Sequence, residues 1–249
     1  MEWVEDFYAK QNEWLGVYKG DVIASHRHNA AVLQRLSGRT DGRVLELGAG
    51  GGQNAAATVD LGYTVTAVEL VPSAVQEAQQ LLTPARQNNL RIIEGDFYKL
   101  EFDAPFDIVC YWDGFGIGTD AEQQRLLKRI AGWLRPDGCA LIEIYGPAYW
   151  AQAAGRQTNF GQVSRRYSFD TEKRRMLDNW WPNGREEQMV TQSLRCYDPD
   201  ELQALLHETG LTLTALESRG AYDAAQNRFL LDVPIKQAMS YLAKLTNSL

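Results

Sequence analysis

The chain has 249 residues, 45% of them hydrophobic, which is enough for one large α/β domain or a standard domain with an insertion. Its formal net charge of −7 disfavours a nucleic-acid partner, because surfaces that bind phosphates are rich in lysine and arginine. No apolar run is long enough to cross a bilayer, and the acidic beginning of the chain differs from a basic secretory leader. Cys110, Cys139 and Cys196 lack the spacing of metal ligands. We therefore expect a reduced, cytoplasmic protein with no bound metal and no membrane partner.

Two helices are predicted before the first strand, between about Trp3 and Arg39. Aromatic residues gather on one side of the first helix, and alanines and leucines recur at helical spacing in the second. Such helices either cover an edge of the sheet or form a lid over a ligand. The sequence leaves both interpretations open.

The stretch Arg43–Gly52 predicts a buried strand that runs directly into a glycine loop. Val44, Leu45 and Leu47 form the continuous apolar run that is typical of a parallel strand buried on both faces. Glu46 interrupts this run, and a carboxylate there is costly unless the site receives a polar ligand. The glycines that follow let the backbone turn tightly and approach a ligand at the start of the next helix. This pattern is typical of a nucleotide-type site.

Helices and strands alternate after the loop. The predicted helices begin at Gln53, at Pro72 and at Asp120, which is predicted to cap its helix. The predicted strands cover Tyr63–Leu70, Arg91–Glu94, Phe106–Trp112 and the segment that follows the Pro-Asp-Gly turn at 136–138. Glu69 ends its strand, where an acidic residue is able to accept both hydroxyl groups of a ribose. Ligands lie outside the carboxyl ends of such strands, so we expect Asp113 and Phe115 to line the site.

The pattern changes at 146–197, where short alternating segments separated by turns predict an inserted antiparallel flap. Asp198 is then predicted to cap a helix. The last strands are predicted at Leu211–Glu217 and Arg228–Val233, joined as an antiparallel hairpin. Apolar residues along one face of Pro234–Leu245 predict a final amphipathic segment that docks on the core.

Four motifs together resemble those of class I S-adenosylmethionine-dependent methyltransferases: E-L-G-A-G-G-G at 46–52, V-T-A-V-E-L at 65–70, G-D-F at 95–97 and L-R-P-D-G at 134–138. The resemblance implies a three-layer, Rossmann-like α/β fold with a mostly parallel seven-stranded sheet and an antiparallel last strand. It also implies S-adenosyl-L-methionine as the cofactor. An NAD(P)-dependent oxidoreductase is the alternative, because Gly50, Gly52 and Ala55 also fit a dinucleotide-binding fingerprint. The fourth motif favours the methyltransferase.

The resemblance also implies roles in the cofactor site. Glu69 would accept the ribose hydroxyl groups, and Asp96 would accept a hydrogen bond from the adenine amine. Arg27 lies on a segment similar to that of glycine N-methyltransferase-like enzymes and would pair with the methionine carboxylate. The expected cofactor-binding residues are Trp14, Tyr18, Arg27, Glu46, Gly48, Ala49, Gly50, Glu69, Leu70, Asp96, Phe97, Tyr111 and Trp112.

The predicted reaction is transfer of a methyl group to a small-molecule acceptor, with an amine nitrogen favoured, by an in-line displacement that depends on proximity and orientation. The alternatives are a small-molecule O-methyltransferase, the oxidoreductase and a non-catalytic binding protein of the same fold. The candidates for catalysis are Tyr8, Tyr18, His26, Asp113 and Phe115. We expect residues 41–145 and 198–249 to form the methyltransferase core, 1–40 a helical lid and 146–197 the acceptor-side flap of a monomer or homodimer.

Overall fold

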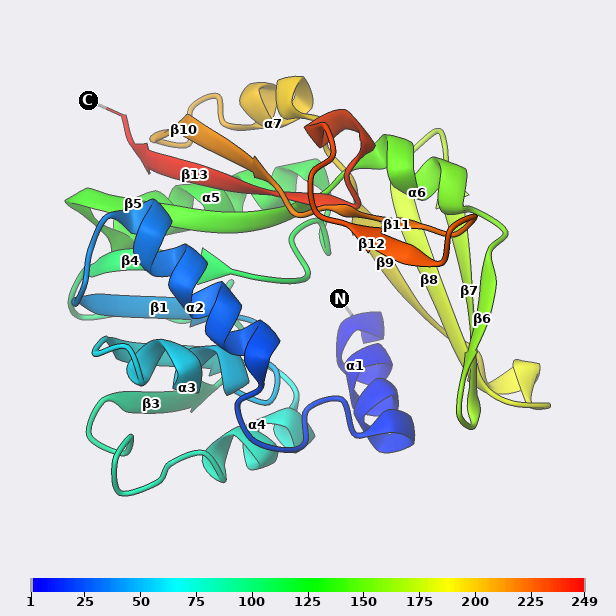
Figure 1. Ribbon diagram of the computed structural model, residues 1–249. Coiled ribbons are helices and arrows are strands. Elements are labelled where there is room, and N and C mark those ends of the chain that lie inside the picture. The colour runs from blue at the N-terminus through cyan, green and yellow to red at the C-terminus, as the bar shows by residue number, and fades with distance from the viewer. Residues whose placement is uncertain (1, 249) are drawn as a thin grey trace.

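The computed structural model describes residues 2–248, and a seven-stranded sheet forms its centre (Figure 1). The strands are β1 (Arg43–Leu47), β2 (Thr64–Glu69), β3 (Leu90–Glu94), β4 (Phe106–Tyr111), β5 (Leu134–Tyr145), β10 (Leu211–Ser218) and β13 (Ser240–Asn247). Their order is β10-β13-β5-β4-β1-β2-β3. β13 is antiparallel to both of its neighbours, and the remaining pairs are parallel. This topology confirms the predicted Rossmann-like fold with an antiparallel last strand.

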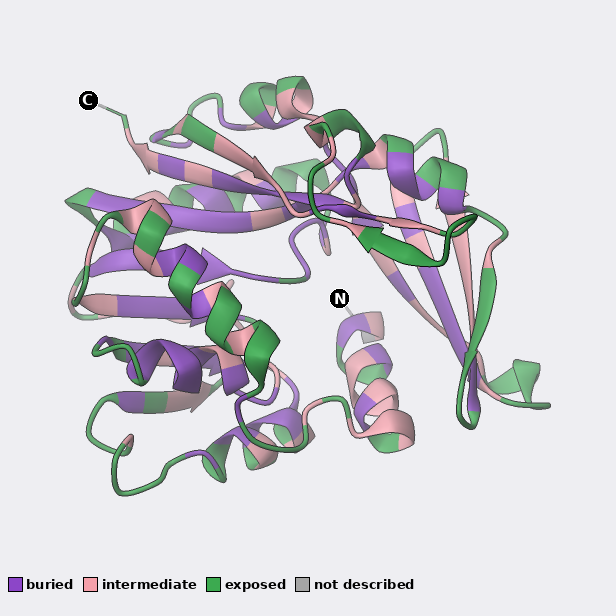
Figure 2. Ribbon diagram, viewed as in Figure 1, coloured by how far each residue is buried: buried purple, intermediate pink, exposed green. Residues whose placement is uncertain are grey.

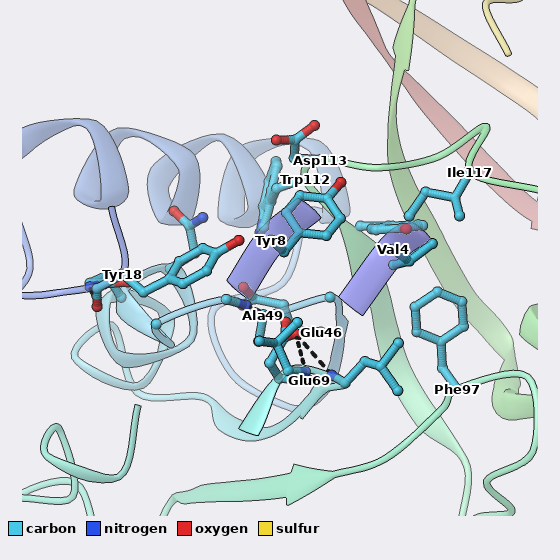
Figure 3. Close-up of a pocket in the computed structure, with 18 of the residues that line it drawn as sticks. Val4, Tyr8, Tyr18, Glu46, Ala49, Glu69, Phe97, Trp112, Asp113 and Ile117 are labelled. Atoms are coloured by element: carbon cyan, nitrogen blue, oxygen red, sulfur yellow. Dashed lines mark hydrogen bonds between the residues drawn. The ribbon is translucent and has the colours of Figure 1, made fainter. Parts of the chain in front are cut away.

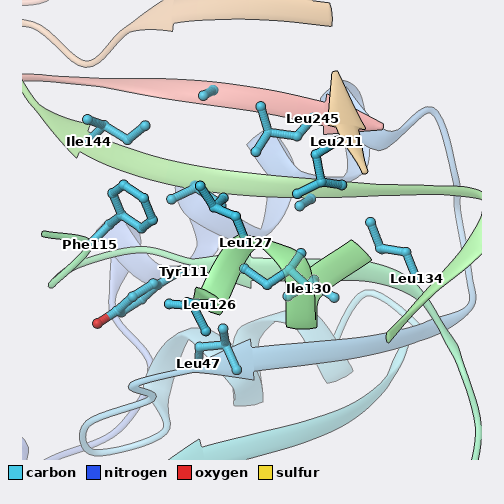
Figure 4. Close-up of a cluster of buried hydrophobic side chains, with 14 of the residues drawn as sticks. Leu47, Tyr111, Phe115, Leu126, Leu127, Ile130, Leu134, Ile144, Leu211 and Leu245 are labelled. Atoms are coloured by element: carbon cyan, nitrogen blue, oxygen red, sulfur yellow. The ribbon is translucent and has the colours of Figure 1, made fainter. Parts of the chain in front are cut away.

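Helices cover both faces of this sheet, so the core has three layers (Figure 1). The helices are α2 (Ala24–Ser37), α3 (Gln53–Val59), α4 (Pro72–Gln79), α5 (Asp120–Trp133) and α7 (Pro199–Leu205). Leu126 and Leu127 of α5 pack on one face of the sheet (Figure 4), together with leucines of α7. Apolar residues of α2 and α3 pack on the other face. Every residue of β4 is buried, as the continuous apolar runs of the sequence predict for strands covered on both faces (Figure 2).

The starts of two helices test the predicted caps. Asp198 caps α7, because its side chain accepts a hydrogen bond from the backbone N–H of Glu201, as predicted. Asp120 does not cap α5. Thr119 holds that position, and its hydroxyl accepts from the backbone N–H of Glu122, so Asp120 becomes the first helical residue.

The C-terminal third corrects the sequence prediction. Residues 228–233 do not enter the main sheet; β11 (Ala221–Asp223) and β12 (Arg228–Leu230) form a separate two-stranded hairpin. The strand that enters the sheet is β13, which overlaps the segment 234–245 that was predicted to dock as an amphipathic unit. Tyr241, Leu242 and Ala243 are consecutive and buried, which is the pattern of a strand covered on both faces rather than of one helical face.

A second sheet follows α6 (Pro147–Ala153), a helix that the sequence analysis missed. Its antiparallel strands are β6 (Gln157–Phe160), β7 (Val163–Asp170), β8 (Arg175–Pro182) and β9 (Val190–Arg195). α1 (Glu2–Leu15) lies between this sheet and the main sheet (Figure 1), and the ring of Phe7 meets Trp180 of β8 edge to face at 6.5 Å. α2 instead belongs to the core, so the predicted lid 1–40 includes a helix that holds the main sheet.

No helix within residues 2–248 is long and apolar enough to span a membrane. The three cysteines are buried and unpaired with one another.

The inner position of β13, between β10 and β5, predicts a large effect of shortening one of its side chains. Leu242 is 1% exposed, so Leu242→Ala should lower the free energy of unfolding by about 2–5 kcal/mol through lost burial and a cavity. Leu231→Ala is the matched control, because Leu231 is 78% exposed. Urea denaturation measures both variants, and equal small effects would contradict the inner position of β13.

Candidate functional site

A cavity of about 270 Å³ opens where the carboxyl ends of β1, β2 and β4 approach α1 (Figure 3). The sequence-predicted residues that line it are Tyr8, Tyr18, His26, Glu46, Gly48, Ala49, Gly50, Glu69, Leu70, Asp96, Phe97, Tyr111, Trp112 and Asp113. The fold therefore brings most of the predicted site into one cavity.

The glycine loop and Glu69 form the floor of this cavity (Figure 3). The Glu69 carboxylate accepts backbone N–H bonds from Gly50 at 2.7 Å, Leu70 at 2.9 Å and Val71 at 2.8 Å. Burial raises the pKa of Glu69, and these three bonds oppose the rise. A Cβ at Gly50 would lie 2.9 Å from the ring of Tyr18, so only glycine allows the ring to rest on the loop.

The Glu46 side chain lines the cavity and carries a buried carboxylate oxygen that accepts no hydrogen bond from the described residues. The residue is 2% exposed, and its Oε2 atom has no hydrogen-bond partner among residues 2–248. Burial, and to a smaller extent the nearby charge of Glu69, raises the pKa of Glu46 to about 8. The sequence analysis expected such a carboxylate to be costly without a polar ligand, and the described part of the chain offers this oxygen no hydrogen-bond donor.

Aromatic and acidic residues form one end of the cavity, after β3 and β4. Asp96 accepts a backbone N–H bond from Tyr98 at 2.9 Å, which fixes the turn that follows β3. The rings of Phe97 and Tyr111 meet edge to face at 5.6 Å. This part of the cavity therefore places the Asp96 carboxylate near the flat apolar faces of two aromatic rings.

Tyr8 and Asp113 line the side of the cavity toward the second sheet. The Tyr8 hydroxyl accepts a hydrogen bond of 2.7 Å from the amide of Gln192, which belongs to β9. Asp113 accepts a hydrogen bond of 3.0 Å from the Tyr145 hydroxyl. The Asp113 side chain is accessible from the cavity that it lines. Protein groups surround it on its other sides, and this desolvation raises the pKa of its carboxyl group.

Three predicted site residues lie elsewhere. Phe115 is 1% exposed and packs against Tyr111 and Tyr197 in the core, so the expectation that it touches an acceptor is wrong. Its flanking glycines have positive φ angles, and the turn they allow directs the ring inward. Trp14 packs beside the apolar contact between α1 and the second sheet. Arg27 is exposed on α2 and does not line the cavity.

His26 lines the cavity, but one of its nitrogens is already used. Its Nδ1 atom accepts the backbone N–H of Ile23 at 3.1 Å at the start of α2. Burial and the neighbouring Arg27 lower the pKa of His26, which favours the neutral ring.

The cavity also contains residues that the sequence analysis did not select: Val4, Val17, Gly51, Gln53, Asn54, Val71, Tyr98 and Ile117. Helical spacing could have found Val4, because it lies four positions before Tyr8 on α1. Gln53 had no such signal. Its amide donates to the backbone carbonyl of Tyr18 at 2.7 Å and so joins the start of α3 to the segment after α1.

Comparisons with known proteins agree with this geometry. A curated relative, the cypemycin N-terminal methyltransferase of a Streptomyces species, is 33% identical over 136 residues, which are 53% of this chain and 50% of the relative. The chain thus spans about half the length of that relative. The solved structure of the CcbJ methyltransferase from Streptomyces caelestis superposes with a TM-score of 0.71 at 20% identity and covers 92% of this chain and 91% of its own. The glycopeptide N-methyltransferase MtfA complexed with S-adenosyl-L-homocysteine superposes with a TM-score of 0.64 at 19% identity and covers 92% of each chain.

The family comparison spans most of the core. Residues 23–216 match a family model described as a methyltransferase domain. The matched segment begins just before α2 and includes the glycine loop, β2 with Glu69 and the second sheet. The chain belongs to this methyltransferase-domain family.

Proposed function

We propose that the protein is an S-adenosyl-L-methionine-dependent methyltransferase that transfers the methyl group to an amine nitrogen of a small molecule. The observation that carries the proposal is the joint position of Glu69, the glycine loop and Asp96 around one cavity. The cavity offers hydrogen-bond acceptors and aromatic surface that would suit the ribose, the amino-acid part and the adenine of S-adenosyl-L-methionine. Family membership supports the same conclusion.

The residues of the cavity fit this cofactor. Glu69 has lone pairs left for the ribose hydroxyl groups, and Asp96 with Phe97 would hold the adenine. The unpartnered Oε2 atom of Glu46 would accept from the ammonium group of the methionine part, and its burial explains why a partner is needed. Tyr18 would cover the methionine part above Gly50.

The mechanism requires the protein to position groups more than to activate them. S-Adenosyl-L-methionine, when bound, supplies a methyl group on a sulfonium, which is already an excellent leaving group. Tyr8, Tyr18 and Tyr111 enclose the cavity, and burial raises the pKa of each phenol, so all three stay neutral. Their rings would exclude water from the cavity, and Tyr8, beside Asp113, would help to position an acceptor nitrogen for attack on the methyl group.

Two observations favour nitrogen over oxygen as the acceptor atom. The names of the cypemycin N-terminal methyltransferase and the glycopeptide N-methyltransferase MtfA place the methyl group of those enzymes on nitrogen. In this chain, the one histidine of the cavity has Nδ1 committed to the backbone, whereas a carboxylate, Asp113, faces the cavity. A carboxylate suits an amine, which would bind as a cation, release one proton to free its lone pair, and regain positive charge when it receives the methyl group.

The cofactor assignment predicts selective binding. Calorimetric titration should show that S-adenosyl-L-homocysteine binds and that NAD(H) and NADP(H) do not. Glu69→Gln should weaken S-adenosyl-L-homocysteine about tenfold or more, because charge-assisted bonds to the ribose are lost. Glu94→Gln is the control, since Glu94 pairs with Glu69 in register but is exposed. Selective binding of a nicotinamide cofactor would overturn the proposal in favour of the oxidoreductase.

The buried carboxyl group of Glu46 predicts a pH-dependent stability. Its pKa of about 8 in the folded protein lies above its ordinary value of 4.5, so between these values the folded state holds a proton that the unfolded chain has released. Raising the pH from 6 to 8 should therefore cost the ligand-free protein about 2 kcal/mol of unfolding free energy through this group. Glu46→Gln should remove that part of the loss, as measured by urea denaturation at both pH values. An unchanged pH dependence in the variant would place the proton elsewhere.

The acceptor atom is testable on molecules that carry both a primary amine and a phenol, such as tyramine and its relatives. With labelled S-adenosyl-L-methionine, the expected products carry the label on nitrogen, and product NMR identifies the atom. Label on oxygen would support the O-methyltransferase instead.

A further inference from the structure

The second sheet carries a row of polar side chains on the face that meets α1 and α6. Alternate residues of a strand share a face, and strand register places Tyr167, Asp178 and Gln192 side by side on β7, β8 and β9. Arg165 lies two positions before Tyr167 on the same face. We call these four residues the polar band. Asp178 and Gln192 are only 1% and 5% exposed.

Apolar clusters flank the polar band on both sides. Phe7 of α1 packs with Val163 and Trp180 at one end. Trp150 of α6 packs with Met176 at the other. Polar groups in the middle of an otherwise apolar, buried face are costly unless they are paired or serve a ligand.

Within the polar band, the charges are balanced. The Arg165 guanidinium donates through two nitrogens to the two carboxylate oxygens of Asp178, with an Nε to Oδ1 distance of 2.8 Å. The guanidinium also lies over the rings of Tyr167, at 4.4 Å, and Trp180, at 4.8 Å. The pair therefore adds no net charge to its surroundings.

Asp113 lies within electrostatic reach of Arg165 and Asp178 of the polar band, whose charges act on it in opposite directions, and it has no ion-pair partner of its own among the described residues. Its carboxylate accepts from the neutral Tyr145 hydroxyl, and no lysine, arginine or histidine of the described residues forms a salt bridge with it. The neighbouring carboxylate of Glu143 has a cation of its own, since Arg219 lies 3.6 Å away. The Asp113 carboxylate thus has no contacting cation among the described residues, and it faces the cavity.

Tyr8 lines the cavity next to the Asp113 carboxylate. Its hydroxyl accepts from Gln192 of the polar band, and its ring lines the cavity beside Asp113 (Figure 3). Its ring offers an aromatic surface to a cation. The end of the cavity that an acceptor would occupy therefore combines an unbalanced carboxylate with an aromatic wall.

We propose that Asp113 binds the acceptor through its positively charged nitrogen, so that the enzyme selects amines that are cationic at neutral pH over neutral or anionic molecules of the same shape. The proposal rests on the proposed function and names the substrate class of that site. For the reaction, the bound ammonium would first lose one proton to water, which frees the nitrogen lone pair. The nitrogen would then bond the methyl carbon while the carbon–sulfur bond breaks and sulfur leaves as a neutral thioether. Positive charge thereby returns to nitrogen, where the carboxylate would stabilise it. Because the charges of Arg165 and Asp178 in the polar band offset each other, the band does not select for a second charged group on the acceptor.

The test uses the full chain saturated with S-adenosyl-L-homocysteine and three probes of one shape: benzylammonium, benzyl alcohol and benzoate. NMR titration should show benzylammonium binding at least tenfold more tightly than benzyl alcohol, with benzoate weakest. Asp113→Asn should lower the affinity for benzylammonium about tenfold and leave that for benzyl alcohol unchanged.

Two further variants control the test. Asp103→Asn makes the same chemical change at an exposed position and should leave the affinities for benzylammonium and benzyl alcohol unchanged. Tyr145→Phe removes the hydrogen bond to Asp113 but keeps its charge, so the preference for the cation should persist. Asparagine still accepts from Tyr145, and an unchanged affinity of Asp113→Asn for S-adenosyl-L-homocysteine shows that the variant is folded.

The outcomes separate the two proposals. Failure of the unmodified protein to bind S-adenosyl-L-homocysteine would overturn the proposed function. If that ligand binds but benzylammonium binds no better than benzyl alcohol, or if Asp113→Asn keeps the preference, Asp113 is not the cation-binding group.

Discussion

The three backbone N–H bonds to Glu69 hold the site together. Through them the end of β2 fixes the glycine loop that follows β1, because one oxygen accepts from Gly50 and the other from Leu70 and Val71. Tyr18 rests on Gly50, so the segment between α1 and α2 takes its place from the same contact. A negative charge in this buried position is tolerable because peptide dipoles surround it.

The two ends of the cavity come from different parts of the chain. The main sheet supplies Glu46, Glu69 and Asp96 at the carboxyl ends of consecutive strands, whereas Tyr8 comes from α1 and is oriented by Gln192 of the second sheet. Changes in the second sheet therefore alter the shape and charge of one end with little effect on the other. A common reaction with varied acceptors is possible on such a scaffold.

The parts of the fold that the sequence predicts well are those whose signals are local. β1, β2 and β4 are buried on both faces and appear as apolar runs that end in glycine or acidic residues, so the main sheet and most of the cavity followed from them. β13 depends on its partners β5 and β10, which are distant in sequence, and its apolar residues also fit helical spacing. Phe115 failed for a related reason, because its loop is at the predicted edge but the direction of its ring depends on the core behind it.

The order of strands also affects how the protein folds as it is made. β13 lies between β5 and β10, so β10 has no place in the sheet until residues 240–247 have been synthesised. Throughout the synthesis of the stretch between Tyr145 and Ser240, the hydrogen-bonding edge of β5 stays open. An open edge on a long apolar strand readily pairs with other chains. Chaperone protection during translation would matter most in this interval.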